Sequence, residues 1–350
     1  MTLCLAPLIA HIVAGVASPV YLHTKQPSWH DRVCHYNPTS IMWRYFAIID
    51  RRIRAKTWNA ADMAASNANF WTTKGWDGSE EMMDLSRSSC TKLPYRPRVS
   101  FLSGSAANTI ITTLQGVQAV YALVIGLVND DYSYTTSLAT LFFPLSVLGL
   151  LRLPAAIYLS SDYSYIDGGA LLADFTYDLP ADLPSNQLLE PPPEVCIYGR
   201  PLYAMGLLEP PSTSASERFH PVNSWRGIIV RIGFLLVVLG ITGLSLVYLL
   251  PRWALTEYTT SNLLSSIFYS IIMAVTSTVF GVYFCQVVSS GTTIIPCINS
   301  IWYKVYTFSL FALAGVLIII MGLETRTTPC GKFTTYPKSI DEIICPSLQL

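Results

Sequence analysis

The stretch GFLLVVLGITGLSLVYLL, residues 233–250, contains no charged residue. Later in the chain, FALAGVLIIIMGL at residues 311–323 is equally apolar. About 20 mainly apolar residues in a helix cross the hydrocarbon core of a bilayer, which is about 30 Å thick. In a soluble protein, several helices of this composition would need amphipathic neighbours to cover them, and the connecting segments contain too few such helices. The two stretches therefore predict transmembrane helices.

The composition of the whole chain agrees with a lipid environment. Of its 350 residues, 51% are hydrophobic and 13% are charged, whereas soluble domains average about 25% charged residues. The 22 basic and 22 acidic residues balance, so the net charge does not indicate a nucleic-acid partner. We predict an all-α integral membrane protein with about six transmembrane helices. They are expected at residues 2–22, 107–128, 135–159, 228–250, 263–287 and 301–323.

The first of these segments, residues 1–22, has a second interpretation as a cleaved signal peptide. Small residues at 13–18 offer a plausible cleavage site. Signal peptides usually begin with a positively charged region, and here no Lys or Arg precedes Lys25. We therefore expect the segment to be retained as a helix.

Basic residues are distributed unevenly among the connecting segments. Region 23–106 contains twelve, loop 160–227 contains three, and the turn NDDYSY at 129–134 contains none. Because cytosolic segments carry the excess of Lys and Arg, we expect both large loops in the cytosol. The N-terminus and the tail at 324–350 would then be non-cytosolic, while the identity of the membrane stays open.

Residues 40–56 predict a basic amphipathic helix, because apolar side chains recur at helical spacing. A helix of this kind lies in the headgroup plane and attracts anionic lipid. The alternative is a cytosolic helix packed on the rest of its loop. The basic side chains expected at the membrane surface are Arg44, Arg51, Arg52, Arg54 and Lys56.

Loop 160–227 is acidic and contains nine prolines. Proline fixes φ and removes a backbone donor, so we expect a mostly extended or disordered tether. Docking of its Pro-rich parts on an aromatic groove is the alternative.

The eight cysteines show no metal-binding spacing, and no metal or cofactor is predicted. Cys330 and Cys345 both follow the last apolar segment. Disulfides persist in non-cytosolic compartments, so we predict a bond between these two.

Ionisable groups inside a membrane are costly and often functional. None of the six expected spans contains Asp or Glu, which argues against a carboxylate relay or metal site. The polar candidates are His11, Gln115, Gln118 and Arg152. The glutamines could line a path or form hydrogen bonds between helices, and Arg152 would be interfacial if its span ends before Pro154.

Three classes of function remain, and no catalytic residue is predicted for any of them. We favour a membrane scaffold or regulatory component that acts through its large loops. The alternative is a transporter or channel with a weakly polar path. A membrane-embedded enzyme is the third class and has the least support. A water-accessible cavity lined by Gln115, Gln118 and Arg152 would favour transport, and a close-packed bundle would favour the scaffold.

Overall fold

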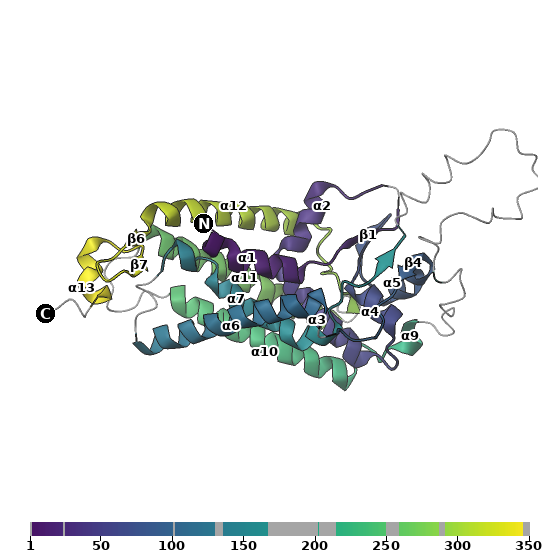
Figure 1. Ribbon diagram of the computed structural model, residues 1–350. Helices are drawn as coiled ribbons and strands as arrows, with labels where there is room; N and C mark the ends of the chain where they lie inside the picture. Colours follow the sequence, from purple (N-terminus) through teal and green to yellow (C-terminus); the bar gives the residue numbers. More distant parts are fainter. Residues whose placement is uncertain are drawn as a thin grey trace, which may run out of the picture.

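The computed structural model describes residues 2–23, 25–100, 102–129, 136–166, 202, 215–249, 259–286 and 291–345. Most of the Pro-rich loop and the NDDYSY turn therefore lie outside the described residues. The protein is mostly helical, with long helices packed side by side and smaller elements at both ends (Figure 1). We call the long helices, together with the shorter α1 and α7 that pack against α6, the bundle. They are α1 (Thr2–Gly15), α6 (Gly104–Asn129), α7 (Phe143–Gly149), α10 (Trp225–Leu249), α11 (Thr260–Cys285) and α12 (Ile301–Glu324).

Four segments of the described chain are long and apolar enough to cross a membrane, which indicates a membrane-associated protein. They are Leu138–Tyr158, Trp225–Gly243, Thr260–Cys285 and Ile301–Glu324. These agree with four of the six spans expected from the sequence. Helix α6 is also long, with 26 residues, and many of its apolar side chains are exposed.

The first helix is shorter than expected. It ends at Gly15 rather than at residue 22, because Pro19–Tyr21 form strand β1. Its 14 residues cover about 21 Å at about 1.5 Å per residue, less than the thickness of a hydrocarbon core.

The segment Leu138–Tyr158 is not one continuous α-helix. Two 3₁₀ segments, η3 (Leu138–Thr140) and η4 (Leu150–Tyr158), flank α7. Prolines explain this division, because each removes a backbone donor. Pro144 lies in the first turn of α7, and Pro154 lies inside η4.

Helix α3 (Pro38–Arg54) was expected on the membrane surface, and this prediction is wrong, because the helix is enclosed by protein. It packs against α1, α10, α11 and η4. Its Trp43 ring lies 5.2 Å from the Phe280 ring, and its Phe46 ring lies 5.5 Å from the Phe234 ring.

The basic residues of this region differ in exposure. Arg44, Arg51 and Arg54 are buried, Arg52 is half-buried, and Lys56 alone is well exposed. The periodicity of the apolar residues had correctly indicated a helix. It could not show that the arginines have partners inside the protein, and these partners are what permits burial.

The smaller elements form a part that we call the head. Strand β1 runs parallel to β2 (Asn69–Thr72), which pairs antiparallel with β3 (Gly75–Asp77). These short strands depart from the expected all-α fold. The remaining elements of the head are α2 (Trp29–Val33), η1 (Cys34–Tyr36), α4 (Ala60–Asn67), α5 (Glu80–Leu85), η2 (Ser86–Ser89), β4 (Cys90–Lys92), β5 (Ser164–Tyr165) and α9 (Ala215–Arg218).

A small cap follows α12 at the end of the bundle far from the head (Figure 1). A disulfide joins Cys330 to Cys345, with their Cα atoms 5.8 Å apart. An ion pair between Arg326 and Asp341 adds a second link. The cap consists of β6 (Arg326–Thr327), β7 (Phe333–Thr334), η6 (Lys338–Ile340) and α13 (Asp341–Ile344).

Candidate functional site

The polar groups of the described chain concentrate where α3 joins the bundle to the head, a region we call the α3 junction (residues 35–54 and their partners). Its strongest ion pairs belong to Arg54. The guanidinium Nε donates to Asp50 at 2.7 Å, Nη2 donates to Glu80 at 2.5 Å, and Nη1 donates to the His220 carbonyl at 3.1 Å. Burial alone would lower the pKa of Arg54, but these two carboxylates raise it above its ordinary value. Arg54 therefore stays charged and links α3 to α5 and to the segment before α10.

Arg51 serves the same junction through backbone carbonyls. Its Nη2 donates to the carbonyls of Gly78 at 2.5 Å and Gly291 at 2.9 Å. Burial lowers its pKa to about 10, so the side chain is still cationic at neutral pH. A Cβ at Gly78 would lie 2.6 Å from the Thr293 hydroxyl, so only glycine permits this close approach.

A second ionic cluster lies within the head. Arg218 of α9 pairs with Asp62 of α4 and, at 2.5 Å, with Asp84 of α5. Arg87 approaches the same carboxylates at 3.4 Å and 3.6 Å. Two arginines and two aspartates therefore hold four short helical elements together, α4, α5, η2 and α9.

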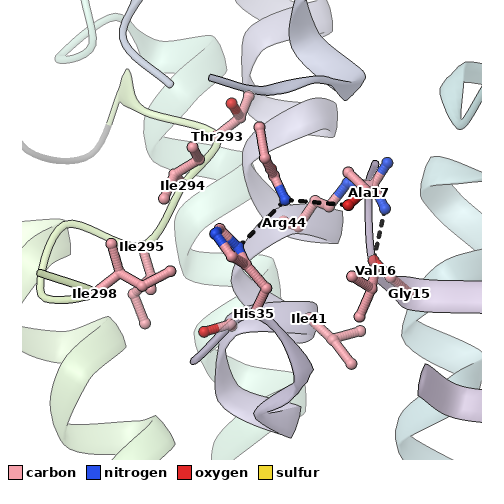
Figure 2. Close-up of a pocket in the computed structure, with 12 residues that line it drawn as sticks. Gly15, Val16, Ala17, His35, Ile41, Arg44, Thr293, Ile294, Ile295 and Ile298 are labelled. Carbon is pink, nitrogen blue, oxygen red and sulfur yellow. Dashed lines mark hydrogen bonds between the residues drawn. The ribbon is translucent and has the colours of Figure 1, made fainter. Parts of the chain in front are cut away.

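A cavity of about 10 Å³ lies beside α3 (Figure 2), close to the minimum space needed for one water molecule. His35 and Asn69 lie at this cavity, and the Asn69 amide nitrogen is 3.2 Å from His35 Nδ1. The amide nitrogen can only donate, so Nδ1 accepts and the ring proton belongs on Nε2. Burial, aided by the charge of Arg44, lowers the pKa of His35 to about 3. The neutral imidazole is thus the form that this site accommodates.

Arg44 and Arg152 approach the end of α1 from two sides. Arg44 Nη1 donates to the Gly15 carbonyl at 2.6 Å, as Figure 2 shows, and Arg152 Nη1 donates to the Ala14 carbonyl. The last carbonyls of a helix lack partners within the helix and carry partial negative charge. The two arginines therefore act as a C-terminal cap for α1.

Arg152 also connects α1 to α6. Its Nε donates to the Thr109 hydroxyl at 2.8 Å, and its Nη2 donates to the Ser105 carbonyl at 3.3 Å. The guanidinium lies over the Tyr45 ring at 5.9 Å. These contacts explain how the arginine is accommodated when it is 2% exposed.

The four polar positions expected within spans do not come together. His11 is buried near Arg152, and neither of its ring nitrogens has a partner among the described residues. Gln115 is half-buried, whereas Gln118 is exposed on the outer face of α6. His11 and Arg152 therefore lie together in the interior, apart from the outward-facing Gln118. Within the described ranges, no three His, Cys, Asp or Glu side chains form a group that could hold a metal ion.

A cluster of hydroxyl and amide groups at the start of α3 was missed from the sequence. Asn37 donates to Thr307 at 2.9 Å, and Ser40 lies 2.6 Å from the Tyr303 hydroxyl. Asn37 is the N-cap residue of α3, and its side chain accepts from the Thr39 amide. The pair Asn37–Pro38 was the available signal, because Asn favours the N-cap and Pro the first helical position.

Comparisons of the chain with protein-family models, with curated proteins and with solved structures found no match.

Proposed function

We propose that the protein is a membrane scaffold or regulatory component, in which the bundle is the anchor and the head is the working surface. The observation that carries this proposal is the α3 junction. Two of its buried arginines, Arg51 and Arg54, donate hydrogen bonds to groups of the head and the adjoining loops, namely Glu80, Gly78, Gly291 and His220. Such links hold the head in one fixed position relative to the bundle. A fixed position is useful for presenting a surface to another molecule.

The positions of the candidate path residues also support this choice over transport. Arg152 directs its donors to Ala14, Ser105 and Thr109, so it joins helices. Gln118 faces outward from the bundle. A polar route built from these residues would need them on one inward surface.

We further propose that the head is cytosolic and that the cap is on the opposite side of a membrane spanned several times. Trp225 and Trp302 are exposed in the first turns of α10 and α12, at the head end of the bundle. Tryptophan favours the interface between lipid and water. Arg226 lies over the Trp225 ring at 5.6 Å, which adds positive charge at the same level. The disulfide at the other end suits an oxidising compartment.

The experiment compares three variants in cells that lack the gene. Tyr95 is 93% exposed, and the Arg96 guanidinium lies 5.7 Å from its ring. Tyr and Arg are enriched in protein interfaces, so Tyr95→Ala combined with Arg96→Ala tests the head surface. Gln115→Leu tests a polar path. Lys74→Ala, at an exposed turn of the head, is the matched surface control.

The scaffold proposal expects the double variant to reproduce the metabolite profile of the deletion at a normal protein level. Gln115→Leu and Lys74→Ala should both restore the wild-type profile. If Gln115→Leu reproduces the deletion while the double variant restores the profile, the protein is a transporter and the proposal fails.

A further inference from the structure

Helix α6 has a second regular face that the described part of the chain leaves uncovered. Residues on this face follow one another at alternating intervals of three and four positions. All are exposed, including Leu114 at 66% and Tyr121 at 67%. We call this face the α6 seam: Gly104, Ala107, Ile111, Leu114, Gln118, Tyr121 and Ile125.

The spacing of the α6 seam is that of a coiled coil. Apolar positions that alternate by three and four residues place every side chain of the set toward a partner helix. The opposite face of α6 is already occupied. Thr109, Thr112 and Ala119 are buried there, and Gly116 fits closely against Leu150. The seam is therefore separate from the contacts that hold the bundle together.

Gln118 is the polar exception at the centre of the seam. It is exposed, and it forms no hydrogen bond with any described residue. Its neighbours on the seam, Leu114 and Tyr121, are large and largely uncovered. An amide left without a hydrogen-bond partner in an apolar medium costs roughly 2–7 kcal/mol. Lipid contact alone would leave this cost unrelieved.

We propose that the α6 seam binds the α6 seam of a second copy of this chain, in parallel and in register, with Gln118 of each copy hydrogen-bonded to Gln118 of the other. A carboxamide both donates and accepts, so two identical side chains satisfy each other across a twofold axis. Twofold symmetry brings identical patches together. A single polar residue in such a seam fixes the register of the pair.

A second copy fits this seam better than an unrelated helix for two reasons. Copies inserted in one membrane share one orientation, so the parallel arrangement requires no further device. The seam extends over three heptads with small residues at the head end, Gly104 and Ala107, where two helices can approach closely. The inference rests on the proposed placement of α6 in the membrane.

Cysteine cross-linking of the full-length chain in native membranes tests the geometry. Single variants Leu114→Cys, Gln118→Cys and Tyr121→Cys should give a disulfide-linked dimer after mild oxidation. Val120→Cys and Val124→Cys are exposed positions outside the seam and should give little. The background carries Cys285→Ser, because Cys285 is an exposed free thiol, together with Cys4→Ser and Cys196→Ser, whose side chains lie outside the described part of the chain. Equal cross-linking at all five positions, or a maximum at Val120 and Val124, would overturn the proposal.

A second measurement separates the hydrogen bond from simple contact. Hydrogen bonds between membrane helices contribute about 0.6 kcal/mol on average, so Gln118→Leu should weaken dimerisation about threefold or more in single-molecule photobleaching. Gln118→Asn keeps an amide and should retain part of the affinity, and Val124→Leu should change nothing. A wild-type chain that bleaches in single steps, or a seam cysteine that links only to a different protein, refutes self-association.

The result can be distinguished from failure of the proposed function. If the wild-type chain is monomeric and the head-surface variants still fail to complement the deletion, self-association is refuted and the scaffold proposal stands. Rapid labelling of Gln118→Cys by a water-soluble maleimide would instead refute the proposed position of α6 in lipid.

Discussion

From the sequence, Arg44 was expected on a lipid surface, and Arg152 was expected within or beside a span. In the folded chain they do the same thing, because each donates to a carbonyl at the end of α1. Charge and spacing in a sequence indicate that a side chain needs partners. They do not identify carbonyls as those partners, since every residue carries one. The same limit applies to Arg51, whose acceptor Gly291 is 240 positions away.

His35 should make the stability of the folded protein depend on pH. Its pKa is about 3 in the folded protein and 6.5 ordinarily, so the unfolded chain binds more protons between these values. The stabilising contribution is complete above pH 6.5 and is lost as the pH falls toward 3, by up to about 1.4 kcal/mol per pH unit. Between pH 7 and pH 5, we expect the unfolding temperature of His35→Gln to fall less than that of the wild-type protein. Identical slopes for both proteins in detergent would contradict this assignment.

Helix α3 shows what the periodicity of apolar residues can predict and what it cannot. The pattern located a helix at 40–56, close to the observed Pro38–Arg54. Its surroundings could not be predicted, because they come from α1, α10, α11 and η4, which are distant in sequence. Ile41 and Ile48 lie outside the expected apolar face, and both are buried. Their apolar character was a signal in the sequence that more than one face of the helix is covered.

Buried ion pairs give α3 its sensitivity to mutation. Asp50 accepts from Arg54 Nε at 2.7 Å, and both side chains are 1% exposed. Asp50→Ala would leave Arg54 with a buried donor unpaired, which typically costs about 3–5 kcal/mol. Lys56→Ala, at the exposed end of the same region, should change stability by less than about 0.5 kcal/mol. Denaturant unfolding of the purified variants measures both, and equal effects would place α3 at the surface after all.

For the molecule as a whole, four of the six expected spans were predictable from the sequence, and the head was not. Length and hydropathy are sufficient for a helix in lipid, because its backbone bonds are internal. The head depends on pairing between remote segments, such as Val20 with Phe70 in the parallel strands. Short strands of this kind have too few residues to show a periodic pattern.

The proposed orientation predicts opposite labelling of the two ends. Lys74→Cys in the head and Lys338→Cys in the cap are both exposed positions. In sealed vesicles with the cytosolic side inward, an impermeant maleimide should label Lys338→Cys and leave Lys74→Cys unlabelled until the vesicles are opened. The reverse pattern would invert the orientation. Peptide mapping without reductant should recover Cys330 linked to Cys345, the pair joined in the cap.

The hydrogen bond from Arg152 to the end of α1 also has a consequence for the order of events during synthesis. Arg152 follows its acceptor Ala14 by 138 residues, so the ribosome completes α1 long before the arginine exists. Until then the Ala14 carbonyl lacks the donor that Arg152 supplies, and the short helix has too little length to span lipid alone. Its final position must therefore be reached late, after α6 and η4 have been made. A ribosome-stalled chain that ends before η4 should leave α1 accessible to protease, and a chain that extends past η4 should protect it.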